Sequence, residues 1–536
     1  MTNDFGTLNW TILIVLLVGK LVLGLYMSKK VDTAEDFYLG KRDMPWWAIG
    51  IATIATYVSA MTFMGAPAWS YKEGLSVIAI HLNYPIVIVL VVTLFLPFFF
   101  NSGVVSIYDY QEKRFGVASR TVIAVVFLVT QILSSAAVLY GTSLVISFIT
   151  GIDVIPSIII VAIVGLVFTM MGGISAVIVM DVVQSGILLV GAGILMYILI
   201  SKMPGSFADT LSQLKAQGKI NPLKWTFDVS QTTTIWTGLI AMTIYHTTVF
   251  GANQMMVQRT LTAKNIGDAK KSLLMMGFTT FFIYFFFVVL GVLLHAYYSG
   301  KTFDNDNKII LNFGAESGMP GLLGIIAAAV LAASMSSLDA AFNSLSTSMT
   351  VDFYQKFIRP GKSPQHYLKS ARWFTILCAA LIILPAIAFS KNTGSILELL
   401  SKVGSFFVGA KLSMYLLGFY SKHTTEKGLL IGVFAGLLGV WIVAATTNIS
   451  WPWYAMIGAG INMGVSLPAS ILLSGYQKEW SPYSIPGQRI KYETEGLPKK
   501  EKGWYLIPGK VDNASYYLLA FFVLTMVFLL AIQHWI

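Results

Sequence analysis

The stretch ATYVSAMTFMG occupies residues 55–65, and the stretch AASMSSLDAAFNS occupies residues 332–344. Both lie inside long apolar runs, yet both carry many hydroxyl groups among small side chains. Carbonyl oxygens freed where a helix unwinds, together with hydroxyls on a facing helix, form the kind of oxygen-rich site that sodium prefers. Small and hydroxyl-bearing residues also let membrane helices pack closely, and composition alone favours this packing role.

The chain around these two stretches is strongly apolar. Of its 536 residues, 56% are hydrophobic and only 11% are charged, whereas a soluble domain carries roughly 25% charged residues. About fourteen apolar runs are long enough to cross a hydrocarbon core about 30 Å thick as helices. We therefore predict an all-α membrane protein with about fourteen transmembrane helices. The predicted spans are 10–28, 46–70, 75–98, 119–149, 154–171, 177–201, 233–257, 271–297, 319–350, 369–390, 394–420, 426–446, 452–475 and 515–535.

Basic residues indicate how these helices are oriented. Lys and Arg gather in alternate loops, including the loop after 10–28 and the long loop 476–514. By the positive-inside rule these loops are cytoplasmic, so a multi-pass cell-membrane protein with both termini extracytoplasmic is predicted. Topology also accounts for the net charge of +11, and no nucleic-acid partner is predicted.

Glycine and proline interrupt several predicted spans, notably around Gly65 and Pro67 in the second and around Gly404 and Gly409 in the eleventh. Membrane helices tolerate such breaks where a cavity or neighbouring helices satisfy the freed backbone groups. Transporters place broken helices at their substrate sites, so these interruptions favour a transporter.

The order of the spans predicts an internal repeat. The second and seventh spans lie five helices apart and run in opposite directions, as the first helices of two inverted five-helix repeats do. The predicted single transporter domain, 1–536, consists of a leading helix (10–28), two inverted repeats (46–201 and 233–420) and accessory helices (426–535) with the cytoplasmic loop 476–514.

Two carboxylates are predicted inside the membrane. Asp339 lies deep in the ninth span, and Asp181 lies near the start of the sixth. A carboxylate at mid-bilayer costs at least about 2.5–3.5 kcal/mol on insertion scales, so it is seldom only structural. For Asp181 a favourable interaction with the helix dipole is the structural alternative. His81 and His246 are single histidines in apolar runs, and each taken alone is typical of a satisfied packing residue.

Several motifs in order resemble the sodium:solute symporter family, and within it the bacterial sodium/sialic acid and sodium/galactose symporters. They are the run 55–67, the Gly172-Gly173 turn before Asp181-Val182-Val183-Gln184, Asn253-Gln254 before Gln258-Arg259-Thr260-Leu261, and Ser336-Ser337 leading to Asp352-Phe353-Tyr354. The resemblance runs through nearly the whole chain. It implies a LeuT-like core of ten helices in two inverted repeats with flanking helices.

The resemblance also implies a main sodium site, with sodium as the co-transported ion. Its ligands are expected to be the carbonyl oxygens of Ala55, Val58 and Ala333 and the hydroxyls of Ser336 and Ser337. Each of these positions matches the family in residue type.

Some family members hold a further sodium, with an aspartate at the position of Asp181 and hydroxyls at the positions of Asp339 and Ala340. An aspartate and an alanine replace those hydroxyls here. Two acidic groups at matched positions favour a second cation held by Asp181 and Asp339. The alternative is that burial keeps Asp339 protonated and silent.

The resemblance places the solute against Tyr57, Ser59, Thr62, His81 and His246. Of these, Ser59 and Thr62 match the sialic acid pattern, whereas Tyr57 and His81 occupy substrate-facing positions with changed chemistry. The inner-gate position implied by the galactose symporter falls on Val249, with Phe250 beside it.

The substrates of these relatives cannot be assigned to this chain from the resemblance. The arginine that sialic acid transporters aim at a carboxylate is Ser134 here, and the lysine and asparagine of sugar transporters are Thr280 and His246. The resemblance therefore predicts a small polar organic solute, such as a sugar or a sugar-acid-like compound. A carboxylate or an amino acid is the alternative.

Other function classes lack their usual signals. Six scattered histidines provide no catalytic constellation, so no enzyme is predicted. A channel needs a repeated pore ring or a symmetric filter, and a sensor needs a soluble signalling domain longer than 476–514. The expected partners are sodium, a small-molecule solute and the lipid bilayer, with no obligatory protein partner.

Overall fold

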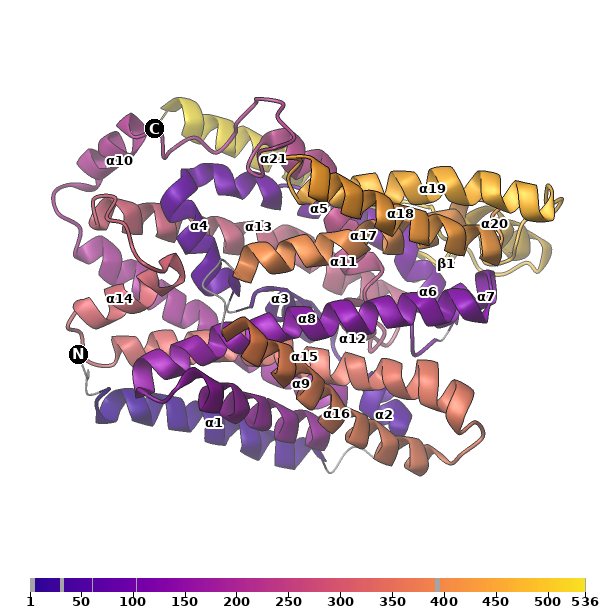
Figure 1. Ribbon diagram of the computed structural model, residues 1–536, viewed down its shortest axis with the longest axis horizontal. Helices are drawn as coiled ribbons and strands as arrows, with labels where there is room; N and C mark the ends of the chain where they lie inside the picture. Colours follow the sequence, from indigo (N-terminus) through magenta and orange to yellow (C-terminus); the bar gives the residue numbers. More distant parts are fainter. Residues whose placement is uncertain (1–4, 29–32, 60, 103, 391–395, 536) are drawn as a thin grey trace.

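The computed structural model describes residues 5–28, 33–59, 61–102, 104–390 and 396–535, and these residues are mostly helical (Figure 1). The α-helices are α1 (Thr7–Ser28), α2 (Ala34–Leu39), α3 (Trp46–Tyr57), α4 (Ala66–Glu73), α5 (Tyr84–Leu90), α6 (Leu96–Ser102), α7 (Asp109–Arg114), α8 (Val117–Thr150), α9 (Val154–Ser201), α10 (Phe207–Ala216), α11 (Met242–Gly251), α12 (Gln254–Thr260), α13 (Ile266–Tyr297), α14 (Ile309–Glu316), α15 (Leu322–Ser348), α16 (Pro364–Ser390), α17 (Ile396–Tyr420), α18 (Glu426–Thr446), α19 (Pro452–Ser474), α20 (Ile485–Thr494) and α21 (Asn513–Trp535).

Shorter elements connect these helices. The 3-10 helices are η1 (Gly40–Arg42), η3 (Gly74–His81) and η6 (Asp306–Lys308), and the π-helices are η2 (Met61–Gly65), η4 (Val91–Phe95), η5 (Thr237–Ala241) and η7 (Met349–Ile358). Strands β1 (Lys500–Glu501) and β2 (Trp504–Tyr505) form a small antiparallel hairpin.

Within the described ranges, ten helical segments are long and apolar enough to cross a membrane. The predicted all-α membrane protein is confirmed. The count of fourteen stays a prediction, because the predicted spans 46–70 and 233–257 are divided into shorter helices and 394–420 is only partly described. Residues 394 and 395, where the predicted span 394–420 begins, lie outside the described residues.

The predicted span 46–70 is broken, but not at Gly65 and Pro67. Helix α3 ends at Tyr57, and Val58 leaves the helical region with φ −81° and ψ 83°. Gly65 has ordinary helical dihedrals, and Pro67 lies in the first turn of α4. A proline is tolerated there because its missing N–H has no partner within the helix. The break therefore lies before the residues that the sequence favoured.

Two further glycine predictions have different outcomes. The predicted separation of 154–171 from 177–201 is confirmed as a kink in α9, where Gly173 has a φ of 57° and a methyl group would lie 2.9 Å from the carbonyl oxygen of Phe37. The predicted interruption at Gly404 and Gly409 is wrong, because α17 continues through both. Gly409 instead allows close packing, since a methyl group there would lie 2.3 Å from the Ala455 carbonyl oxygen on α19.

The predicted span 233–257 consists of η5, α11 and α12, with a break between α11 and α12. Ala252 leaves the helical region, and the Asn253 side chain accepts a hydrogen bond from the Met255 amide at 3.0 Å. Such a side-chain cap supplies an acceptor for an amide that has none within the new helix. The first long span of each predicted repeat is therefore discontinuous.

Helix α15 lies at the centre of the molecule and is almost wholly buried. It packs against α1, α3, α8, α9 and α16, whereas α17, α18 and α19 pack together at one side (Figure 1). This position brings the hydroxyl-rich stretch 332–344 next to the end of α3.

The start of α1 and the end of α21 lie at one end of the molecule, and α7, α20 and β1 lie at the other (Figure 1). The loop 476–514 contains α20 and the hairpin. It is attached to other loops predicted to be cytoplasmic, because Lys270 forms a buried ion pair with Asp512 at 2.6 Å and Tyr110 donates a hydrogen bond to the Tyr483 carbonyl oxygen at 2.8 Å.

Candidate functional site

A cavity of about 340 Å³ lies where the end of α3 faces α15. Helices α9 and α13 complete its walls. Four of the five residues predicted to hold the main sodium ion line this cavity: Ala55, Val58, Ala333 and Ser336. The tertiary structure thus brings together residues that are almost 280 positions apart in the sequence.

The break after α3 frees backbone oxygens beside this cavity. In a continuous helix the Ala55 carbonyl would accept from the Ser59 amide, but that amide donates to Tyr57 at 3.1 Å. The Val58 carbonyl likewise loses the Thr62 amide, which donates to Ser59 at 2.9 Å. Freed carbonyls of this kind coordinate sodium at discontinuous helices in transporters.

The two serines of α15 differ in their contacts. The Ser337 hydroxyl donates to the Thr56 carbonyl at 2.9 Å and lies 3.4 Å from the Ala333 carbonyl, which ties α15 to the end of α3. The Ser336 hydroxyl is buried close to the Asp181 carboxylate, and neither that carboxylate nor any other described residue forms a hydrogen bond of normal geometry with it. A buried unpaired hydroxyl costs roughly 1–3 kcal/mol, so it marks a position suited to an additional ligand.

Asp181 is paired with an arginine. Its Oδ2 lies 3.0 Å from a guanidinium nitrogen of Arg259, and both side chains are buried. The Asp181 Oδ1 has no hydrogen-bond partner in the described part of the chain. Three residues further along α9, Gln184 also lines the cavity between α3 and α15, which we call the sodium cavity after the predicted ion. Its amide has no hydrogen-bond partner among the described residues.

Asp339 is paired with a lysine from the leading helix. The Lys20 ammonium on α1 lies 2.6 Å from its Oδ2, and Thr169 donates to its Oδ1 at 3.3 Å. The structure therefore places Asp181 and Asp339 in separate ion pairs with basic side chains. The second cation at these two carboxylates stays a prediction.

On the opposite side of the break, Tyr57 and His246 contact each other. The Tyr57 hydroxyl lies 2.7 Å from the His246 Nε2, and the His246 Nδ1 lies 2.9 Å from the Asn83 Oδ1. A neutral imidazole donates from one nitrogen and accepts at the other, so both nitrogens are satisfied by these neighbours.

Two more predicted solute residues join the same cluster. Thr62 pairs with the Tyr284 hydroxyl at 3.1 Å, and the His81 Nδ1 lies 2.8 Å from the Tyr84 hydroxyl. The His81 and Tyr284 rings are stacked, with their centroids 3.6 Å apart. We call Tyr57, Thr62, His81, Asn83, Tyr84, His246 and Tyr284 the aromatic cluster.

The remaining predicted residues lie at the edge of this cluster. Ser59 is half-buried within the break itself. Of the two predicted inner-gate residues, Phe250 is buried and its ring centroid lies 5.0 Å from that of Tyr57, whereas Val249 is half-buried. Phe250, rather than Val249, thus packs over the aromatic cluster.

Sequence reasoning missed five residues of these sites: Lys20, Asn83, Tyr84, Arg259 and Tyr284. Lys20 carried a usable signal, because it is a charged residue inside an apolar run. Arg259 lies in a motif that supported the family resemblance. The other three are polar residues within apolar segments, and only their packing reveals their contacts.

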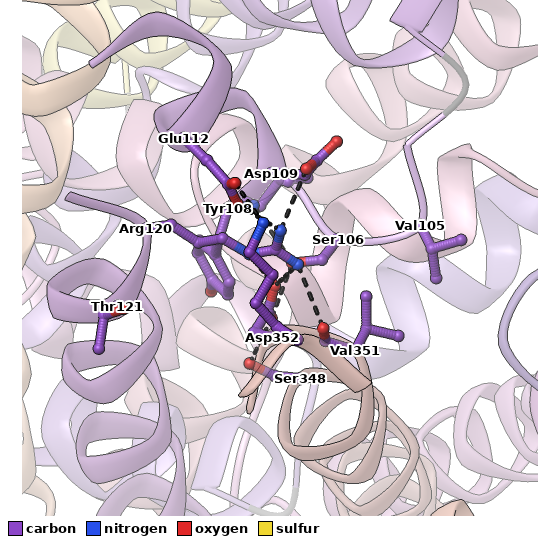
Figure 2. A network of polar contacts seen from close by, with 12 residues as sticks. Val105, Ser106, Tyr108, Asp109, Glu112, Arg120, Thr121, Ser348, Val351 and Asp352 are labelled. Atoms are coloured by element: carbon purple, nitrogen blue, oxygen red, sulfur yellow. Dashed lines mark hydrogen bonds and ion pairs between the residues drawn. The ribbon is translucent and has the colours of Figure 1, made fainter. Parts of the chain in front are cut away.

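A third polar region lies near the end occupied by α7 and α20. Figure 2 shows the Arg120 guanidinium between the carboxylates of Asp352, Asp109 and Glu112, at distances of 2.8, 3.1 and 2.8 Å respectively. Lys356 also contacts Glu112. These residues connect α7, α8 and η7, and we call them the Arg120 network.

Comparisons with known proteins support the family resemblance that the sequence motifs indicated. Residues 37–436 match the sodium:solute symporter family. The sodium/sialic acid symporter SiaT of Proteus mirabilis is 28% identical over 473 residues, covering 85% of this chain and 93% of SiaT. A sodium/glucose cotransporter of Vibrio parahaemolyticus is 28% identical over 465 residues, covering 80% of this chain and 83% of the cotransporter.

A solved structure of a Na⁺-coupled sialic acid symporter, in a substrate-bound outward-open state, superposes with a TM-score of 0.82. It is 26% identical in sequence and covers 89% of this chain and 100% of the symporter chain. The resemblance inferred from the motifs is confirmed, as is sodium as the co-transported ion, and the relatives are transporters. The chain belongs to the sodium:solute symporter family and is a multi-pass membrane protein that couples sodium flow to solute transport.

Proposed function

We propose that the chain imports a sugar or sugar-acid-like solute, driven by a sodium ion that enters the cavity between α3 and α15. The ligands are the carbonyls of Ala55, Val58 and Ala333 and the hydroxyls of Ser336 and Ser337. The unpaired, buried Ser336 hydroxyl, facing carbonyls freed by the break, is the observation that carries this assignment.

The aromatic cluster is the proposed solute site. Its hydroxyl, imidazole and amide groups are hydrogen-bonding groups without a permanent charge. In the contacts described, no lysine or arginine pairs with a member of the cluster. Such a lining suits the hydroxyl groups that sugars and sugar acids share better than it suits a simple carboxylate, whose only polar group needs a charged or strongly donating partner when buried. The named relatives carry sialic acid and glucose, which are both polyhydroxylated.

Alternating access is proposed to involve two inverted five-helix repeats, 46–201 and 233–420, in a LeuT-like core. The breaks after α3 and after α11 support this division, because they fall in the first long span of each repeat. Both breaks lie beside the proposed sites, as expected of transporters in which discontinuous helices hold the cargo. Both termini are extracytoplasmic in this arrangement.

The sodium gradient supplies enough energy for strong accumulation. One sodium ion moving down a 100 mV potential yields about 2.3 kcal/mol, and a tenfold concentration gradient adds about 1.4 kcal/mol. One ion can therefore drive roughly 500-fold accumulation of a neutral solute, and two ions would square that limit.

The test is a thermal-stability screen of the purified chain against sugars, sugar acids, monocarboxylates and amino acids, in sodium and in potassium. The expected result is a sugar or sugar acid that stabilises the protein only in sodium and that accumulates in potassium-loaded proteoliposomes only when sodium is present outside. Stabilisation by an amino acid or a simple carboxylate alone would overturn the solute proposal. Solute-independent current would favour a channel.

A further inference from the structure

The leading helix contributes a fully buried cation to the region around the sodium cavity. Lys20 has no exposed surface, and its ammonium group lies 2.6 Å from the Asp339 Oδ2. Asp339 lies on α15 three residues after Ser336, which is about one helical turn. The pair is thus adjacent in the helix to the proposed main sodium site.

The surroundings of Lys20 enclose its ammonium group. The nitrogen lies 4.7 Å from the centroid of the Phe168 ring, and Thr169 next to that ring donates to Asp339. At Gly24, one turn beyond Lys20 on α1, a methyl group would lie 2.8 Å from Phe168. Helix α1 therefore packs closely on α9 beside the lysine head group.

We propose that the Lys20 ammonium takes the place of a second transported cation beside Asp339, so that the chain moves one sodium ion per transport cycle. The inference rests on the proposed main sodium site. Its chemistry is charge replacement: Asp339 needs one positive charge in the membrane interior, and a covalently attached ammonium supplies it permanently.

A sodium ion cannot readily share Asp339 with this lysine. Two unit positive charges about 4 Å apart, at an effective dielectric constant of about 20, repel strongly enough to weaken sodium binding on the order of a thousandfold. The neighbouring carboxylate, Asp181, is neutralised in the same way by Arg259. Both acidic residues near the main site are therefore balanced by side chains.

Counting bound sodium tests the proposal without any knowledge of the solute. Equilibrium binding of radioactive sodium to the purified full-length chain is expected to give one ion per chain for the wild type. Lys20→Met and Lys20→Gln, which leave Asp339 without its cation, are expected to bind one ion more. The double variant Lys20→Met with Asp339→Asn is expected to return to one ion, because the carboxylate is then absent.

Lys270→Met is the matched control, because Lys270 is also fully buried and lies 2.6 Å from an aspartate, Asp512, outside the sodium cavity. Its count should equal that of the wild type. Two ions in the wild type, or no gain in Lys20→Gln, would overturn the proposal. Loss of the main site has a separate signature, since Ser336→Ala with Ser337→Ala lowers the affinity for one ion in the wild type and in Lys20→Gln alike.

Discussion

Polar groups on the two sides of the break after α3 differ in their hydrogen bonding. Toward α15, the break leaves carbonyl oxygens without helical donors and faces the unpaired Ser336 hydroxyl across a cavity. Toward α11 and α13, the hydroxyls and imidazoles of the aromatic cluster are mostly bonded to one another. The same few residues of α3 thus border a cavity, which is the proposed ion site, and a hydrogen-bonded cluster, which is the proposed solute site.

This difference indicates how many existing hydrogen bonds sodium and the solute must each replace on binding. At the proposed sodium site the Ala55 and Val58 carbonyls have already lost their helical donors, so a sodium ion would not have to break those helix hydrogen bonds. A solute must replace hydrogen bonds that cluster residues make with one another, and a solute unable to do so leaves buried groups unpaired at roughly 1–3 kcal/mol each. We therefore expect the aromatic cluster to select among solutes. On the α15 side, we expect sodium to bind strongly before the solute arrives.

The largest expected effect is on stability, through the ion pair beside the sodium cavity. Asp181→Ala leaves the buried Arg259 guanidinium without its carboxylate, and breaking a buried pair in this way costs about 3–5 kcal/mol. We expect a large drop in the thermal unfolding temperature of the purified protein. The double variant Asp181→Leu with Arg259→Met should recover most of the lost unfolding temperature. An unchanged unfolding temperature in Asp181→Ala would contradict the ion pair.

On the solute side, His246→Ala removes the partner of both Tyr57 and Asn83. At roughly 1–3 kcal/mol per unmet group, the half-saturation concentration of the stabilising solute should rise about tenfold or more. Thr62→Ala, which frees the Tyr284 hydroxyl, should act in the same direction. Sodium binding should stay unchanged in both.

Thr243→Ala is the control for these variants, because Thr243 lies on α11, as His246 does, and among the described residues its hydroxyl bonds to the local Leu239 carbonyl alone. If neither His246→Ala nor Thr62→Ala alters the solute half-saturation, the solute site lies elsewhere and the comparison between the two sides fails.

On the sodium side, Ser336→Ala combined with Ser337→Ala removes both hydroxyls that face the broken helix. We expect sodium affinity to fall at least tenfold, about 1.4 kcal/mol, in a direct binding measurement. Ser334→Ala is the matched control, because Ser334 is equally buried in α15 but bonds to the Val330 carbonyl of its own helix. Equal sodium affinity in the double variant and the control would remove the serines from the site.

The smallest effect is expected in the Arg120 network, which lies outside both sides of the break. Burial acts to raise the pKa of the Glu112 carboxyl, but hydrogen bonds and charges from Lys356 and Arg120 outweigh it and hold that pKa below its ordinary value. The stabilisation is therefore present above the ordinary pKa of about 4.3 and is lost as the pH falls through the lower folded-state value.

Melting temperatures of the wild type and Glu112→Gln, measured between neutral pH and pH 3, check this prediction. The wild type should be slightly more stable at neutral pH and should lose that margin on acidification, whereas sodium affinity at neutral pH should be the same in both. If the difference in melting temperature between the wild type and Glu112→Gln grew at low pH, it would contradict the lowered pKa of Glu112.

Local sequence predicted the membrane class and most of the helix positions. The spans 426–446 and 452–475 agree closely with α18 and α19, because a long apolar run has no other way to satisfy its backbone in lipid. The break in 46–70 was expected at Gly65 and Pro67 and is found at Val58 instead. The position of a break depends on what replaces the lost hydrogen bonds, and here that includes the Ser337 hydroxyl bonded to Thr56.

The sequence by itself determined that this chain crosses a membrane many times, that α3 and α15 carry oxygen-rich segments, and that two carboxylates lie among apolar residues. Hydropathy and residue type are local properties, so they can be read without a fold. Only the tertiary structure decided which charges meet: Lys20 and Asp339 are 319 residues apart, and Arg259 and Asp181 are 78 apart. A buried charge takes whichever partner the helix packing brings within hydrogen-bond distance, because neither charge is stable alone in a medium of low dielectric constant.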